Sequence, residues 1–133
     1  MGKFDKAEEV FEVLIKNSFE DDLEGLSRRY HLMGSVKQHK GDYKEALILY
    51  KKALNSYRFL SNSSQLDFTI LYNDIGSTYR YKGEYSKSLK YHQMALDIQN
   101  RSNPLNYSDL VITYGNLAEF FFYYTRVKGQ IKA

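Results

Sequence analysis

The sequence contains no cysteine, no tryptophan and a single proline in 133 residues. Without cysteine it can form neither a disulfide nor a thiolate metal site. No apolar run approaches the ~18 residues expected of a membrane-spanning helix. The amino-terminal stretch MGKFDKAEEV also lacks the apolar segment of a secretory signal. We therefore expect a cytoplasmic protein without a membrane partner.

The chain also has little excess charge of either sign. Its formal net charge is +3, too small over this length to indicate binding to nucleic acid. Hydrophobic residues make up 43% and charged residues 26% of the chain, a balance typical of a folded, water-exposed domain. The composition thus indicates a soluble globular domain.

What the sequence does contain is an internal repeat. The stretch GDYKEALILYKKAL, from Gly41, returns 42 residues later as GEYSKSLKYHQMAL, from Gly83. Ten identities link residues 27–68 to residues 69–110 at this offset. Self-similarity with a period of about 20 to 50 residues is typical of stacked arrays. Repeated residues therefore indicate repeated architecture rather than a catalytic site.

Each copy is predicted to form two helices. Bulky and small residues recur at helical spacing over 72–79 and again over 89–96, with Gly83 between the two stripes. A glycine there can end one helix and let the next begin. The small residues Gly34 and Gly76 allow two helix backbones to approach closely. The sequence therefore predicts an all-α fold of antiparallel helix pairs.

The residues of the second copy carry a resemblance to the tetratricopeptide repeat (TPR), whose consensus is matched in order by Tyr72, Ile75, Gly76, Tyr79, Gly83, Tyr85, Ser88, His92 and Ala95. Ser88 replaces the usual alanine and His92 the usual tyrosine. The 42-residue period and the stretch NPLNYSDLVITYGNLAEF are similar to kinesin-light-chain-like repeats. In the first copy Lys37 occupies the place of Tyr79, so we expect that helix to pack less tightly.

The resemblance implies a right-handed α-solenoid that covers the chain as a single array, 1–133. It places the second helix of a partial repeat at 1–18 and complete repeats at 24–65 and 66–107. The first helix of a further partial repeat, followed by a tail, is expected at 108–133. We interpret this arrangement as a slice of a longer array.

In this family the first helices line a concave groove that binds partners. The resemblance therefore implies that a protein or peptide segment binds at Arg28, His31, Ser35, Gln38, Asn73, Asp74, Ser77, Arg80, Tyr81, Asn116, Glu119 and Tyr123. Amides can pair with a peptide backbone, arginines can bind a carboxylate, and tyrosines can anchor an apolar side chain. The carboxylate clamp of the chaperone-binding members is not expected, because none of its positions matches.

We expect no catalysis, metal or cofactor from this segment. His31 and His39 are eight residues apart, so the HxxxH metal spacing is absent, and no nucleophile elbow occurs. The alternative function is a structural or regulatory spacer within a larger protein, for instance one linked to an ADP-ribosyltransferase. The apolar stretch LAEFFFYYT, from Leu117, also predicts head-to-tail self-association through the terminal helices, unless RVKGQIKA folds back over it as a cap.

Overall fold

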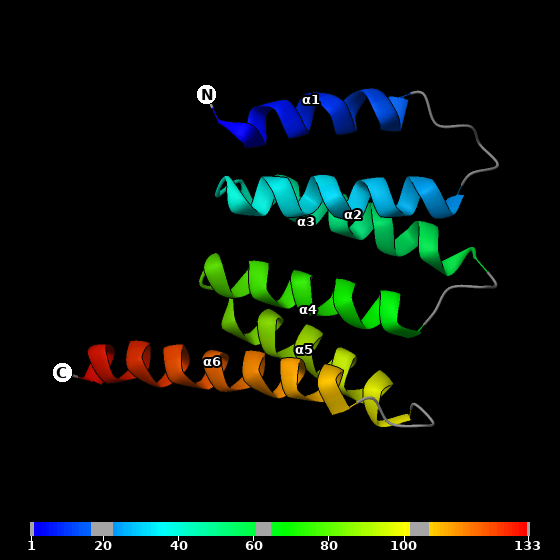
Figure 1. Ribbon diagram of the computed structural model, residues 1–133. Helices are drawn as coiled ribbons and strands as arrows, with labels where there is room; N and C mark the ends of the chain where they lie inside the picture. The colour runs from blue at the N-terminus through cyan, green and yellow to red at the C-terminus, as the bar shows by residue number, and fades with distance from the viewer. Residues whose placement is uncertain (1, 17–22, 61–64, 102–106, 133) are drawn as a thin grey trace. The chain divides into compact units, whose positions relative to one another are not determined.

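The computed structural model describes residues 2–16, 23–60, 65–101 and 107–132. These residues form helices and no strand (Figure 1): α1 (Lys3–Lys16), α2 (Leu23–His39), α3 (Tyr43–Arg58), α4 (Gln65–Tyr81), α5 (Tyr85–Arg101) and α6 (Tyr107–Lys132). The chain divides into two compact units, Met1–Leu71 and Tyr72–Ala133, with the boundary inside α4. We refer to them as unit 1 and unit 2.

The two tight turns between paired helices depend on glycine. Gly41, between α2 and α3, has φ of 84°, and Gly83, between α4 and α5, has φ of 83°. Side chains with a Cβ rarely adopt this left-handed backbone. After the first turn, the Asp42 side chain accepts a hydrogen bond from the Glu45 backbone N–H and so caps α3. The glycines therefore end the helices where the sequence predicts.

In unit 1, α2 and α3 form a closely packed pair around Tyr50. Ala46, Tyr50 and Ala53 on α3 are fully buried. A Cβ added to Gly34 on α2 would lie 2.7 Å from the Tyr50 ring. Gly34 therefore lets the tyrosine lie flat against the α2 backbone, as the small-residue pattern predicts.

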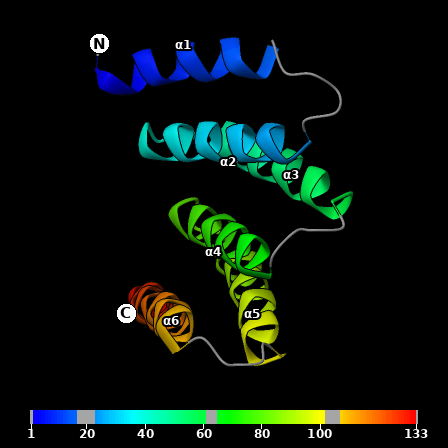
Figure 2. The same ribbon diagram turned by 45° about the vertical axis from the view of Figure 1, so that its right-hand side comes forward.

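The helix α1 packs beside α2 and forms ion pairs with it (Figures 1 and 2). Lys37 Nζ lies 3.2 Å from a Glu8 carboxylate oxygen. Lys40 Nζ lies 2.7 Å from both Asp5 Oδ1 and Glu8 Oε1. The Lys40 ammonium lowers the pKa of both carboxyls below their ordinary values. A carboxylate on α1 thus compensates the charge of Lys37, which occupies the position that Tyr79 has in the second copy.

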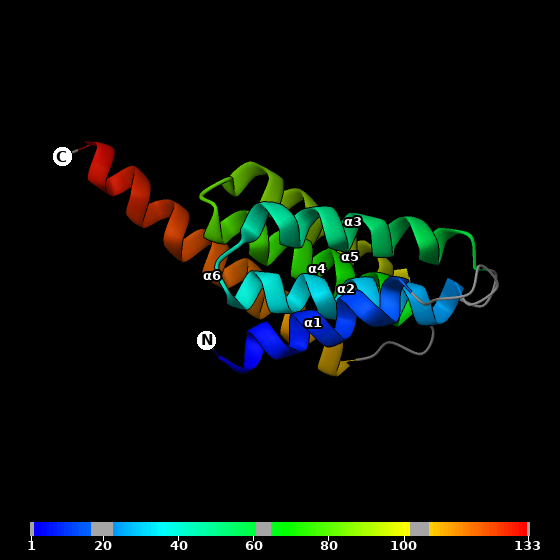
Figure 3. The same ribbon diagram turned by 90° about the horizontal axis from the view of Figure 1, so that it is seen from above.

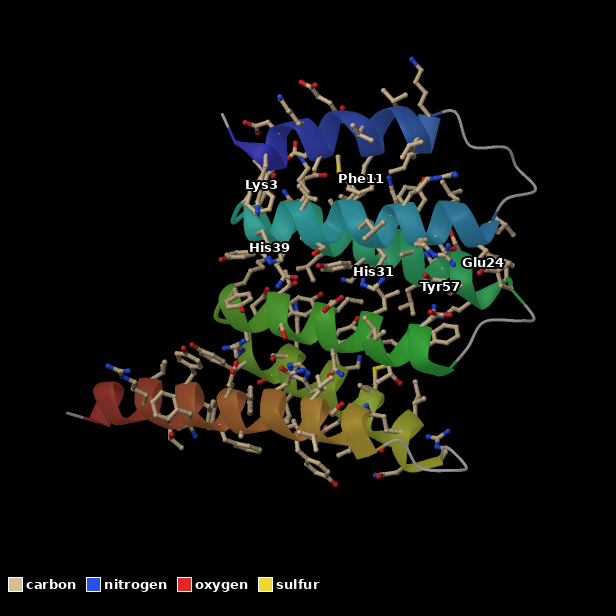
Figure 4. The ribbon with its side chains drawn as sticks, in the orientation of Figure 1. Lys3, Phe11, Glu24, His31, His39 and Tyr57 are labelled. Atoms are coloured by element: carbon tan, nitrogen blue, oxygen red, sulfur yellow. The ribbon has the colours of Figure 1, made fainter. Side chains whose placement is uncertain are left out.

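Apolar contacts accompany these ion pairs. The Phe4 ring stacks on the His39 ring with the centroids 5.8 Å apart, and Phe11 lies between α1 and α2 (Figure 4). These ring contacts and the ion pairs together hold α1 against α2.

Replacing Lys40 by methionine is expected to loosen α1. The change removes the ammonium that pairs with Asp5 and Glu8, so amide hydrogen exchange should speed up in residues 3–16 while α3 keeps its protection. High salt should act in the same direction. Protection of α1 should also fall as the pH drops below 4.5, the ordinary pKa of glutamate, because the folded state holds these carboxylates ionised.

The matched control is Lys6→Met, which removes the same charge from an exposed position on α1 itself. If the amides of residues 3–16 exchanged equally fast in the two variants, the idea that the Lys40 ion pairs hold α1 on α2 would be wrong.

In unit 2, the second half of α4 packs on α5, and α5 packs on α6. Tyr91 on α5 meets the rings of Tyr72 and Tyr79 on α4, with centroids 6.1 Å and 5.6 Å away. Phe120 on α6 is buried against Tyr85 on α5. The same helix-pair packing therefore occurs in both units.

The last helix is longer than expected. α6 continues for 26 residues to Lys132, and its carboxyl end projects beyond the end of α5 (Figures 1 and 3). The expected tail of the 108–133 segment is thus helical, and RVKGQIK continues the helix instead of folding back as a cap. The RVKGQIK stretch includes no proline, and its single glycine, Gly129, is tolerated within a helix.

Candidate functional site

The predicted site residues of the first copy mainly support packing within unit 1. The His31 ring meets the Tyr50 ring edge-on, with centroids 5.6 Å apart. Gln38 Oε1 accepts a hydrogen bond of 2.7 Å from the Tyr50 hydroxyl. Ser35 is half-buried, and Arg28 is exposed and paired with the glutamate one turn earlier. Two of these four side chains are therefore committed to positioning Tyr50.

Asn73 differs from the expectation of an exposed groove residue. Its residue surface is only 7% exposed. Its Oδ1 accepts a hydrogen bond of 2.9 Å from His92 Nδ1 on α5, and its Nδ2 donates one of 3.1 Å to Thr113 Oγ1 on α6. The reason is that α4 contacts helices on two sides at this point, so both faces of the amide are covered. Asn73 therefore joins three helices instead of facing a partner.

His92 is a buried polar residue that the sequence analysis did not single out as a site. It is fully buried, and burial, followed by the nearby Arg80 charge, lowers its pKa from 6.5 to about 4. The imidazole is therefore neutral at physiological pH, with the proton on the Nδ1 that donates to Asn73. The available signal was its departure from the tyrosine of the repeat consensus.

Arg80 is the centre of the second predicted cluster. Its side chain is 7% exposed, and its Nη2 lies 2.9 Å from Glu119 Oε2 on α6. The guanidinium carbon lies 4.8 Å from the Tyr81 ring centroid and 5.3 Å from that of Tyr123. Arginine stacks on aromatic faces in this way because its charge is spread over a planar group. Its buried Nε has no hydrogen-bond partner among the described residues.

A hollow of about 530 Å³ lies between α4 and α6 at this cluster, lined by Arg80, Tyr81, Ala118, Glu119, Phe122 and Tyr123. A smaller one of about 240 Å³ adds Tyr85 from α5. Tyr81 and Tyr123 expose 52% and 42% of their surface, so their rings are open to a ligand. The structure thus brings together four of the predicted site residues: Arg80, Tyr81, Glu119 and Tyr123.

The remaining predicted residues of unit 2 do not line the hollow. Asp74, Ser77 and Asn116 are half-buried on α4 and α6. Within the described residues, no group of three histidine, aspartate or glutamate side chains is placed to hold a metal ion. No described helix is long and apolar enough to cross a membrane. The hollow can therefore bind a ligand by ring stacking and apolar contact, and it contains a guanidinium whose charge is compensated by Glu119.

Two stretches of the chain match the tetratricopeptide repeat family, residues 27–58 and residues 70–103. The chain is a TPR protein. The two matches fall on the helix pairs α2–α3 and α4–α5. They confirm the family that the sequence pattern indicates.

The fold of this TPR protein is shared with BtubC (BKLC) from P. vanneervenii, whose crystal structure matches with a TM-score of 0.69 at 19% sequence identity. The match covers 94% of this chain and 49% of that one, so the chain spans about half the length of BtubC. At this identity the likeness shows the fold alone. It confirms the predicted all-α TPR solenoid. No curated protein matches the sequence.

Proposed function

We propose that this TPR chain is a non-catalytic interaction module that binds a protein or peptide segment in the hollow between α4 and α6. TPRs are generally protein–protein interaction modules, which supports a protein partner. The small net charge of +3 favours protein over nucleic acid as the ligand. Arg80, Tyr81, Glu119 and Tyr123 are the residues that we assign to the contact.

The observation that carries the proposal is the stack of Arg80 on two exposed tyrosines. A buried guanidinium held by rings and by one carboxylate is a rigid group, so little side-chain entropy is lost when a ligand covers it. Tyrosine and arginine are also enriched among the residues that contribute most to binding at protein interfaces. The Tyr81 and Tyr123 rings can take an apolar side chain of the partner, and the Arg80 edge can take a backbone carbonyl or a carboxylate.

The proposal is tested with a peptide selected from a displayed random library on the purified chain. Arg80→Met keeps the alkyl stem but removes the charge, and Tyr123→Ala removes one ring. Each is expected to weaken binding of the selected peptide by roughly 1.5 to 3 kcal/mol, at least tenfold in Kd by calorimetric titration.

Arg101→Met is the matched control, because Arg101 is an exposed arginine of unit 2 on the second helix of the pair. It should leave the Kd unchanged. Circular dichroism melting of each variant separates lost binding from lost folding. Peptides that bind equally to all three folded variants would exclude the hollow as the site and favour the spacer function instead.

A further inference from the structure

α6 has an exposed apolar stripe that borders the hollow and shares only Ala118 with it. Thr113 and Phe120 face inward and are buried. Tyr114, Ala118 and Phe121 lie on another side of the helix, and the two rings are 55% and 53% exposed. Within unit 2, as far as it is described, no helix covers this stripe. A row of two large rings around a small residue is unusual on an exposed helix face.

The chain itself shows what covers such a stripe. The residues 42 positions earlier are Tyr72, Gly76 and Tyr79 on α4, and there the stripe is buried. The rings of Tyr72 and Tyr79 flank Tyr91 on α5. Gly76 lies so close to α5 that an added Cβ would come within 2.8 Å of the His92 ring. The covering element in this repeat is thus a second helix of α5 type.

α1 is a helix of this type with an uncovered side. Its Gly2 and Phe4 match Gly83 and Tyr85 of the repeat, and the same offset of 81 residues places Val10 at the position of Tyr91. Val10 is 56% exposed and Leu14, one turn later, is 40% exposed. The side of α1 that corresponds to the α4-facing side of α5 is therefore apolar and open to solvent.

We propose that these two surfaces bind each other between copies of the chain. The α1 helix of one molecule lies on the α6 stripe of another, with Val10 between Tyr114 and Phe121, as Tyr91 lies between Tyr72 and Tyr79. Ala118 takes the place of Gly76 and keeps the helices close. The helix that covers the stripe comes from a second copy of the chain, because the residues of α1 align with those of α5. Within unit 2, α5 is the helix that covers the equivalent stripe.

The contact joins two different surfaces, so it is head-to-tail. Each pair of molecules keeps one open stripe and one open α1, so assembly continues into a chain or a ring. Glu119 and Tyr123 lie on another side of α6 from Phe121, so the hollow and this contact can be separated by mutation. The self-association thus goes beyond the proposed binding of a peptide.

The test uses Val10→Glu and Phe121→Glu in the full chain, studied by sedimentation velocity over a concentration series. The parent chain should grow in mass with concentration, and each variant alone should stay monomeric. A mixture of the two should form a 1:1 dimer that grows no further, because one partner supplies the intact α6 and the other the intact α1. Ile112→Glu, at an α6 position that is 58% exposed and off the stripe, should assemble like the parent chain.

A parent chain that is monomeric at every concentration would overturn the proposal. So would a Val10→Glu variant that still dimerises, because that result indicates a symmetric contact between two α6 helices. Helical circular dichroism spectra of all variants exclude unfolding as the cause of lost assembly.

Discussion

Replacing Gly76 by leucine is expected to lower the free energy of unfolding by about 1 to 3 kcal/mol or more. The site has no room, because even a Cβ there would lie 2.8 Å from His92 Nε2 and 2.9 Å from Cε1. The ring cannot easily move aside, since its Nδ1 is hydrogen-bonded to the buried Asn73. In an array whose stability depends on neighbouring helices, this loss should lower the melting temperature of the chain by several degrees.

Gly115→Leu is the matched control for this change. Gly115 lies inside α6, and a Cβ added to it meets nothing within 4 Å. Leucine forms helices better than glycine by up to about 1 kcal/mol, so this variant should melt at or above the temperature of the parent chain. Similar melting temperatures for the two variants would contradict the close α4–α5 contact.

Acidification from pH 7 to pH 5 is expected to lower the free energy of unfolding by about 2 kcal/mol through His92 alone. Its pKa is lowered from 6.5 to about 4 in the folded chain. Between these two pH values the unfolded chain binds a proton at His92 that the folded chain excludes. The contribution of the neutral His92 to the free energy of unfolding is therefore fully present above pH 6.5 and declines as the pH falls toward 4. Urea unfolding at a series of pH values measures this slope.

His92→Tyr should remove that part of the pH dependence, because tyrosine does not titrate in this range. Position 50 of unit 1, equivalent to 92, already holds a tyrosine against Gly34, so the ring is compatible with such a site. His39→Gln, at an exposed position, should keep the slope. An unchanged slope in His92→Tyr would show that His92 is not the group responsible.

The contrast between Asn73 and Arg80 shows what helical periodicity can and cannot predict about a side chain. Both lie on the same helix and were predicted to face a partner. Arg80 lines the hollow with Tyr81 and Tyr123. Asn73 is covered by His92 and Thr113, which belong to two other helices. Helical periodicity places a residue on one side of its own helix, but it does not say how many other helices cover that side.

The sequence by itself determined the helix pairs, the glycine turns and the TPR family, because these depend on local spacing and on the repeat of 42 residues. Tertiary structure decided which polar side chains are buried and what they bind. The ion pairs of Lys37 and Lys40 with α1, and the ion pair of Arg80 with Glu119, join residues that are at least 29 positions apart. Such contacts depend on distances between helices, and no local pattern of residues encodes those distances.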